Sequence, residues 1–218
     1  MHSFFDPSST SLKVCGITLA EDAKRLVTEG IPALGVNFWP KSKRYVTPSK
    51  AAEFLPALKG QILRVGVFVN ADKDDVLHLL VNDIIDVAQF HGDESPEYCR
   101  VFTEDGHAFI RAIGVKNAGS ISNILDYQAT AILLDAHAPG LYGGTGDTFD
   151  WNLAKDVIIQ NPDLPILLAG GITSTNAEEA TRSVRPAGLD LASGSESSAG
   201  IKDFDKIRAI QAAIKAAE

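Results

Sequence analysis

The sequence predicts an α/β protein in which eight strand–helix units form a single-domain (β/α)8 TIM barrel. Short apolar runs alternate with longer amphipathic stretches along the chain of 218 residues. The runs are rich in Val, Ile, Leu and Phe and show little polar alternation, which is typical of strands buried on both faces of a parallel sheet. Each stretch between them is long enough for a crossover helix, and eight such units in a chain of this length indicate a barrel.

The apolar runs are the expected strands of this barrel. They are Leu12–Cys15, Ala33–Asn37, Ile62–Val69, Ile85–Gln89, Ala108–Ile113, Ala131–Asp135, Pro165–Ala169 and Gly188–Leu191. The alternative architecture is an open doubly wound sheet, which normally carries a glycine-rich turn after its first strand. Residues 15–18 read Cys-Gly-Ile-Thr at that place, so the barrel is favoured.

The expected helices lie between these runs. They are Ala20–Glu29, Pro48–Leu58, Asp72–Asn82, Ser95–Thr103, Ala118–Tyr127, Trp151–Gln160, Thr175–Arg182 and Asp203–Ala217. Thr18 is the expected N-cap of the first helix and Gly30 its C′ residue, and Pro48 suits the first turn of the second. The pattern places the barrel domain at residues 12–218, after a lead-in of residues 1–11 that we expect to be loose.

Composition and charge narrow the functional class. Hydrophobic residues make up 45% and charged residues 22% of the chain, which is ordinary for a globular protein with one core. The net charge of -8 argues against a nucleic-acid surface, whereas an anionic substrate stays open because a local site can be positive. We find no signal peptide and no apolar run near the ~20 residues of a membrane helix. Two cysteines without a ligand pattern favour a cytoplasmic protein.

The active site of such a barrel lies at the C-terminal ends of the strands, and glycines follow two of these ends. Gly170 and Gly171 follow the seventh strand, and Ser193 and Gly194 follow the eighth. Turns of this kind let backbone N–H groups approach an anion, and a short helix after the eighth strand would add its positive end. We therefore predict a phosphate site here, the other interpretation being that these residues serve only the turns.

Two further strand ends carry possible acid–base groups. Asp135 lies where the sixth strand meets a glycine-rich loop, and a carboxyl at that depth can stay protonated and act as a general acid. Cys15 ends the first strand, and its thiolate can act as a base if a nearby cation favours ionisation. The residues alone leave both roles open, since Asp135 can equally cap its loop and a lone cysteine is more often simply buried. Cys99, within a helical pattern, is interpreted as buried.

The loop after the second strand is basic within an acidic protein. Lys41, Lys43 and Arg44 lie there, either as holders of a second anionic group or as a solvated charge run. His91 follows the fourth strand, where it either lines the site or is satisfied within its own turn.

Several segments resemble one known family in the same order along the chain. They are Lys13–Thr18, Phe38–Val46, Gly66–Asn70, Gln89–Gly92, Leu134-Asp135, Gly143–Gly146 with Phe149–Trp151, and Ala169–Ile172. In these residues the chain resembles phosphoribosylanthranilate isomerase, from about Leu12 to the final helix. The resemblance implies an isomerase of tryptophan biosynthesis. Its reaction is the Amadori rearrangement of N-(5-phosphoribosyl)anthranilate to 1-(2-carboxyphenylamino)-1-deoxyribulose 5-phosphate.

The resemblance also implies roles for particular residues. Asp135 would protonate the ribose ring oxygen, so that the ring opens to a Schiff base, and Cys15 would remove the proton from C2. Arg44 would hold the anthranilate carboxylate. The remaining substrate contacts implied are His91, Gly144 and Asp190, with the phosphate at Gly170, Gly171, Ser193 and Gly194. The family needs no metal or organic cofactor and includes monomers and dimers, which implies a monomer or homodimer here, without nucleic-acid or membrane partners.

The chain departs from the family pattern at three positions, and two other functions compete. Lys43 stands where proline is common, and Ala192 and Ser195 stand where the family usually has serine and an apolar residue, with effects on the loop and phosphate site left open. A dual-substrate sugar-phosphate isomerase that also serves histidine biosynthesis would use an aspartate as its first-strand base, so Cys15 argues against it. A non-catalytic phosphate-binding barrel would not need both Cys15 and Asp135.

Overall fold

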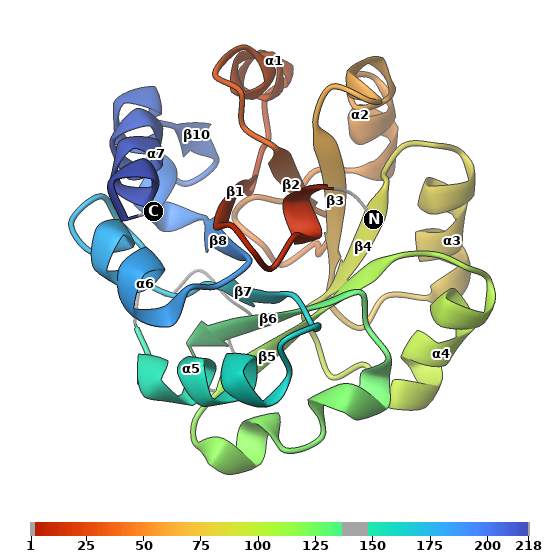
Figure 1. The fold of residues 1–218 in the computed structure, drawn as a ribbon. Helices are drawn as coiled ribbons and strands as arrows, with labels where there is room; N and C mark the ends of the chain where they lie inside the picture. The colour runs from red at the N-terminus through yellow and green to blue at the C-terminus, as the bar shows by residue number, and fades with distance from the viewer. Residues whose placement is uncertain (1–2, 137–147, 218) are drawn as a thin grey trace.

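The strands close into a barrel in which each pairs in parallel with the next and the last pairs with the first. The computed structural model describes residues 3–136 and 148–217. The strands are β1 (Ser11–Cys15), β2 (Ala33–Asn37), β3 (Leu63–Phe68), β4 (Val87–Phe90), β5 (Phe109–Val115), β6 (Ala131–Ala136), β7 (Ile166–Leu168) and β8 (Gly188–Leu191). Helices surround them, as Figure 1 shows, so the predicted (β/α)8 barrel is confirmed.

The helices differ in length and type. The α-helices are α1 (Ala20–Thr28), α2 (Pro48–Ala52), α3 (Lys73–Val81), α4 (Pro96–Glu104), α5 (Trp151–Gln160), α6 (Ala177–Val184) and α7 (Phe204–Ala217). The 3-10 helices are η1 (Ser3–Phe5), η2 (Pro56–Leu58), η3 (Ala118–Ile121), η4 (Ile124–Tyr127) and η5 (Ser193–Ser195). A hairpin of β9 (Glu196–Ser198) and β10 (Ile201–Lys202) follows η5.

Every expected strand is present, but two expected helices are broken. The second ends at Ala52 and resumes only as η2, because Pro56 has no N–H to donate to the carbonyl four residues earlier and its ring clashes with that carbonyl. Residues 118–127 form two 3-10 helices instead of one α-helix. Ser120 is the reason at the start, since its hydroxyl accepts hydrogen bonds from the N–H groups of Lys116 and Asn117 and so favours a tight turn.

The predicted N-cap of α1 is wrong. Leu19 occupies the cap position with no side-chain hydrogen bond, whereas the Thr18 hydroxyl donates to the carbonyl oxygen of Gly200 at 2.7 Å. Thr18 therefore ties the end of β1 to the β9–β10 hairpin, a contact between segments that are distant in sequence. Gly30 follows α1 with φ +70°, as expected for a glycine that ends a helix.

The interior of the barrel is apolar at its N-terminal end. Phe4 and Phe5 of η1 are only 1% and 2% exposed and pack against inward-facing residues of the strands. These partners include Ala33, Leu63, Val65, Val87, Ile110, Ala131, Leu133 and Leu167. Part of the lead-in thus belongs to the core, although we expected it to be loose. The domain boundary at residue 11 stays a prediction.

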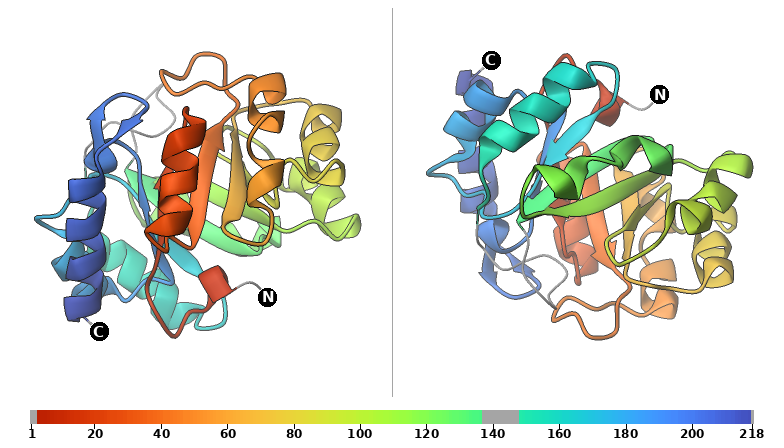
Figure 2. Two further views of the ribbon diagram at one scale, coloured as in Figure 1. Left: turned by 90° about the horizontal axis from the view of Figure 1, so that it is seen from above. Right: turned by 90° about the horizontal axis from the view of Figure 1, so that it is seen from below.

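The two ends of the barrel carry different segments. In the left view of Figure 2, η1 closes one end, while the loop after β2 and the β9–β10 hairpin rise from the other. The second end is where the C-terminal ends of the strands lie, and so where the site is expected. None of the helices that the structure describes is long and apolar enough to span a membrane.

Candidate active site

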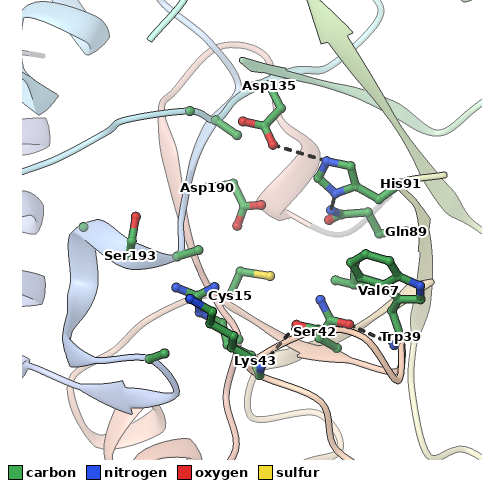
Figure 3. A pocket seen from close by; sticks show the side chains of 18 of the residues that line it. Cys15, Trp39, Ser42, Lys43, Val67, Gln89, His91, Asp135, Asp190 and Ser193 are labelled. Carbon is green, nitrogen blue, oxygen red and sulfur yellow. Dashed lines mark hydrogen bonds and ion pairs between the residues drawn. The ribbon is translucent and has the colours of Figure 1, made fainter. Parts of the chain in front are cut away.

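A cavity of about 470 Å³ lies at the C-terminal ends of the strands, and Figure 3 shows the side chains that line it. The structure brings together nine of the predicted site residues. They are Cys15, Arg44, His91, Asp135, Gly170, Gly171, Asp190, Ser193 and Gly194. The tenth, Gly144, lies outside the described residues. Lys41 and Lys43 also line the cavity, so the basic loop contributes to the site.

Cys15 ends β1, and its sulfur points into the cavity. Gly35 on β2 makes room for it, since a Cβ there would lie only 2.7 Å from Sγ. Burial raises the pKa of the thiol, and the ammonium groups of Lys13 and Lys202 counteract this only in part. Cys99, by contrast, is fully buried on α4 and does not line the cavity, and burial raises its pKa to about 12.

Asp135 enters the cavity from the opposite side, at the end of β6 (Figure 3). Its side chain is buried, and Oδ1 accepts a hydrogen bond from the N–H of Ala136 at 2.8 Å. The other oxygen, Oδ2, lies 3.2 Å from Nε2 of His91. Nδ1 of His91 accepts in turn from Nε2 of Gln89 at 3.2 Å, which leaves Nε2 of the ring as the donor to the carboxylate. His91 therefore orients the carboxyl group rather than only closing its turn.

Arg44 lies over the end of β1 and forms a two-pronged ion pair with Glu196 of β9. Its Nε donates to Oε1 at 2.8 Å and its Nη2 to Oε2 at 2.6 Å. Gly16 permits this position, because a Cβ there would lie 2.3 Å from Cδ of Arg44. The hydrogen bond from Arg44 outweighs burial and raises the arginine pKa. For Glu196, burial opposes ionisation, but the bonds and charges of Arg44 and Lys202 prevail and lower its pKa.

Lys202 of β10 connects this ion pair to the first strand. Its Nζ donates to Oε1 of Glu196 at 2.8 Å and to the backbone oxygen of Cys15 at 2.6 Å. Burial lowers the pKa of Lys202, and its anionic neighbours only partly offset that effect. The β9–β10 hairpin thus fixes Arg44 relative to Cys15.

The two glycine turns form the remaining wall of the cavity. Gly170 and Gly171 have φ of +80° and +61°, a left-handed conformation that side chains disfavour. A Cβ on Gly194 would lie 1.9 Å from the carbonyl oxygen of Ile172, so the turns after β7 and β8 pack directly on each other. The short helix expected after β8 is a single 3-10 turn, η5, which begins at Ser193.

Several polar or charged side chains that support the site were not predicted as site residues, among them Lys13, Gln89, Glu196 and Lys202. Lys13 and Gln89 carried a local signal, since each interrupts an apolar strand on its inward face. Glu196 and Lys202 carried none, because only the hairpin and the closing of β8 onto β1 bring them to Arg44 and Cys15. Among residues 3–136 and 148–217 no group of three or more His, Cys, Asp or Glu side chains could hold a metal ion.

Comparisons with known proteins show which family this chain is similar to. A family model described as N-(5'phosphoribosyl)anthranilate (PRA) isomerase matches residues 12–213. An N-(5'-phosphoribosyl)anthranilate isomerase of Pseudomonas syringae pv. syringae is 41% identical over 211 residues, which cover 95% of this chain and 98% of that protein.

Solved structures agree with the sequence comparison. A phosphoribosylanthranilate isomerase from Thermotoga maritima, solved as monomers generated from a dimeric enzyme, has a TM-score of 0.82 and 34% identity and covers 95% of this chain and 99% of its own. Another, in complex with reduced 1-(o-carboxyphenylamino)-1-deoxyribulose 5-phosphate, has a TM-score of 0.79 and 35% identity and covers 95% and 98%.

Proposed function

The chain belongs to the N-(5′-phosphoribosyl)anthranilate isomerase family, and we propose that Cys15 and Asp135 are the base and the acid of its reaction. The reaction is the Amadori rearrangement of phosphoribosylanthranilate in tryptophan biosynthesis. The observation that supports these roles is their position, since both side chains reach the same cavity from opposite sides. A sugar between them can be protonated on one side and deprotonated on the other.

The proposed reaction begins at Asp135. Its carboxyl group protonates the ribose ring oxygen, and the C1–O bond breaks as the nitrogen lone pair forms a Schiff base. The Cys15 thiolate then takes the proton from C2, and the electrons of that bond form the C1–C2 double bond of an enolamine. The enolamine tautomerises to the ketone. Ring opening and C2 deprotonation each move one proton to or from a positioned side chain, which contributes about 10²–10⁴-fold to a rate.

Gln89 and His91 suit the acid role because they can support Asp135 in both protonation states. Oε1 of Gln89 is buried and has no hydrogen-bond partner among the described residues. Rotation of the amide would offer this oxygen to a proton on Nδ1 of His91, and Nε2 would then accept from a protonated Asp135. The unrotated amide favours the carboxylate that remains after protonation of the sugar.

The two anionic ends of the substrate need two binding sites within the cavity. We propose that the phosphate binds at the turns of Gly170-Gly171 and Ser193-Gly194, with Asp190 nearby. We propose that Arg44 binds the anthranilate carboxylate. Its Nε and Nη2 edge is held by Glu196, while Nη1 has no partner among the described residues and remains available. The proposed contact of Gly144 lies outside those residues.

We also propose that the protein is cytoplasmic and acts as a monomer or homodimer, without nucleic-acid or membrane partners. Its acidic balance and the existence of monomers generated from the dimeric T. maritima relative support this. Sedimentation with and without added DNA or vesicles tests it.

An isotope experiment tests the acid and the base separately. Freshly prepared substrate with deuterium at ribose C2 slows only the step assigned to Cys15. We expect Cys15→Ser to increase the deuterium effect on kcat, because C2 deprotonation then limits turnover. Asp135→Asn should suppress the effect, because ring opening then limits it. Cys99→Ser is the matched control and should behave as the parent. If Cys15→Ser keeps the kcat and isotope effect of the parent, Cys15 is not the base.

A further inference from the structure

Lys13 is a fully buried cation inside the barrel, directly below the catalytic cavity. It lies two residues before Cys15 on β1, and both side chains point to the interior. A buried ammonium is costly unless it is paired. Its Nζ donates to Oδ1 of Asp190 on β8 at 2.9 Å, and it faces the same space beside Gly35 as the sulfur of Cys15. One ammonium group is thus paired with a carboxylate and lies close to a thiol.

Gly35 on β2 is what allows this arrangement. A Cβ at that position would lie 2.7 Å from Sγ of Cys15 and 3.1 Å from Nζ of Lys13. The missing side chain therefore leaves the space in which the sulfur and the ammonium approach each other. Any larger residue at position 35 would separate them.

Charged groups from four elements face the Cys15 thiol. They are Lys13 on β1, Arg44 in the loop after β2, Asp190 on β8 and Lys202 on β10, and Glu196 on β9 pairs with two of them. Lys202 bonds the backbone oxygen of Cys15, and Arg44 is engaged by Glu196. Among these cations Lys13 acts most strongly on the sulfur, since its charge lowers the pKa of the thiol more than that of Lys202 does.

The titration of the pair follows from these positions. Burial opposes the charge of Lys13, but Asp190 and Cys15 prevail and raise the pKa of the lysine, so it stays an ammonium at neutral pH. Burial raises the pKa of Cys15, Lys13 lowers it more than any other charge does, and Asp190 raises it again. The carboxylate therefore acts against the ammonium at the sulfur.

We propose that Lys13 is a positioning residue whose buried ammonium stabilises the thiolate that Cys15 forms on ionisation at the cavity, and that Asp190 limits this by competing for the same ammonium. The inference rests on the proposed role of Cys15 as the base. Before turnover the thiol proton passes to water, and the sulfur keeps the electron pair beside the Lys13 ammonium. The thiolate then accepts the proton of substrate C2 and becomes a neutral thiol, while the C–H electrons pass into the enolamine.

The test follows the thiolate directly, without the substrate. The rate of alkylation by iodoacetamide is measured against pH in a Cys99→Ser background, so that Cys15 is the thiol observed. We expect Asp190→Asn to move the profile to lower pH and to speed alkylation at pH 7 by about tenfold, since the buried ammonium then has the thiolate as its anion. Lys13→Met should move the profile to higher pH.

If Lys13→Met does not fold, the double variant Lys13→Met/Asp190→Asn still allows the effect of Lys13 on the thiol to be measured. It removes both buried charges, and such replacements are often neutral for stability. Because Lys13 outweighs Asp190 at the sulfur, the double variant should still titrate at higher pH than the parent. The pH profile of kcat should shift in the same direction as the alkylation profile.

An unchanged alkylation profile in Asp190→Asn and in the double variant would overturn the inference. This outcome is separate from failure of the proposed function. If Cys15→Ser retains the parent kcat, then Cys15 is not the base, although the alkylation profile would still report whether Lys13 stabilises its thiolate.

Discussion

The two ends of the barrel interior are built on the same strands but from opposite chemistry. We call the end of the barrel at the N-termini of the strands the lower end and the end at their C-termini the upper end. Along β6 the inward residues are Ala131 and Leu133 at the lower end and Asp135 at the upper end. Along β4 the same period of two leads from Val87 to Gln89. Below, Phe4 and other apolar side chains fill the space, whereas above, charged groups surround a cavity.

This difference shows how apolar packing at one end of the barrel can offset the free-energy cost of burying charged groups at the other. Apolar packing at the lower end needs only volume and shape. Buried charges at the upper end need partners, and the structure supplies them in the pairs Lys13–Asp190 and Arg44–Glu196. We therefore expect substitutions at the upper end to change the reaction and those at the lower end to change stability.

The largest difference between an effect on kcat and an effect on stability should come from substitutions of the proposed acid and base. Cys15→Ser or Asp135→Asn should lower kcat by about 10²–10⁴-fold, with a smaller effect on substrate binding, because a proton-transfer group is lost. The melting temperature should change little, since each replacement keeps nearly the same volume. Steady-state kinetics with fresh substrate and thermal unfolding measure the two effects. A kcat within about threefold of the parent, with chemistry limiting, would contradict these roles.

The lower end should give the reverse result. Phe4→Ala should reduce the free energy of unfolding by about 3–5 kcal/mol, because it leaves a cavity where an almost completely buried ring was packed. The kcat of the folded protein should stay at the parent value. Urea unfolding followed by circular dichroism, with kinetics well below the transition, checks both. A large fall in kcat for the folded variant would mean that the two ends are coupled.

Arg44→Ala should have a smaller and more specific effect. Loss of a hydrogen bond to a charged group weakens recognition by about 10–150-fold, mainly in KM. Product analogues with and without the aromatic carboxylate distinguish substrate recognition from the ion pair with Glu196. The variant should penalise the carboxylated analogue much more. Equal penalties would indicate that Arg44 serves only to hold the hairpin.

The smallest expected effect is the pH dependence of kcat/KM, which should be set by the upper end of the barrel and not by the lower end. Because burial raises the pKa of Cys15, the thiolate fraction is small at low pH and grows as pH rises through that value. The parent kcat/KM should therefore climb on the alkaline side by up to about tenfold per pH unit. Phe4→Ala should show the same profile at lower overall stability. A flat profile from neutral to alkaline pH would exclude thiol ionisation as a limit on the rate.

The strand pattern and most of the cavity were predictable from local sequence. Buried parallel strands are nearly continuous apolar runs, so all eight could be placed. Their C-terminal ends and the loops that follow then indicated eight of the residues that line the cavity, whereas Asp190 came from the family resemblance. The roles of Cys15 and Asp135 were not derivable from the residues alone. Their assignment came from the family resemblance and stays a prediction for the kinetics to test.

Helix ends were less predictable because several signals compete over a few residues. Thr18 has the side chain of an N-cap, yet its hydroxyl bonds the β9–β10 hairpin instead. At the start of residues 118–127 the Ser120 hydroxyl accepts hydrogen bonds from two backbone N–H groups, which favours a tight turn over a continuous helix. Such local alternatives differ by little energy, so the surrounding structure selects between them.

By itself the sequence determined which positions are apolar. These positions form eight continuous runs, which predict eight strands that are buried on both faces of a parallel sheet. Only the closed barrel decided which charges meet. Lys13 and Asp190 are 177 residues apart and become partners because β8 pairs with β1. Arg44 and Glu196 are 152 residues apart and meet because the hairpin after β8 folds over the end of β1. Apolar burial depends on composition at each position, whereas an ion pair depends on two positions at once, and only the fold relates them.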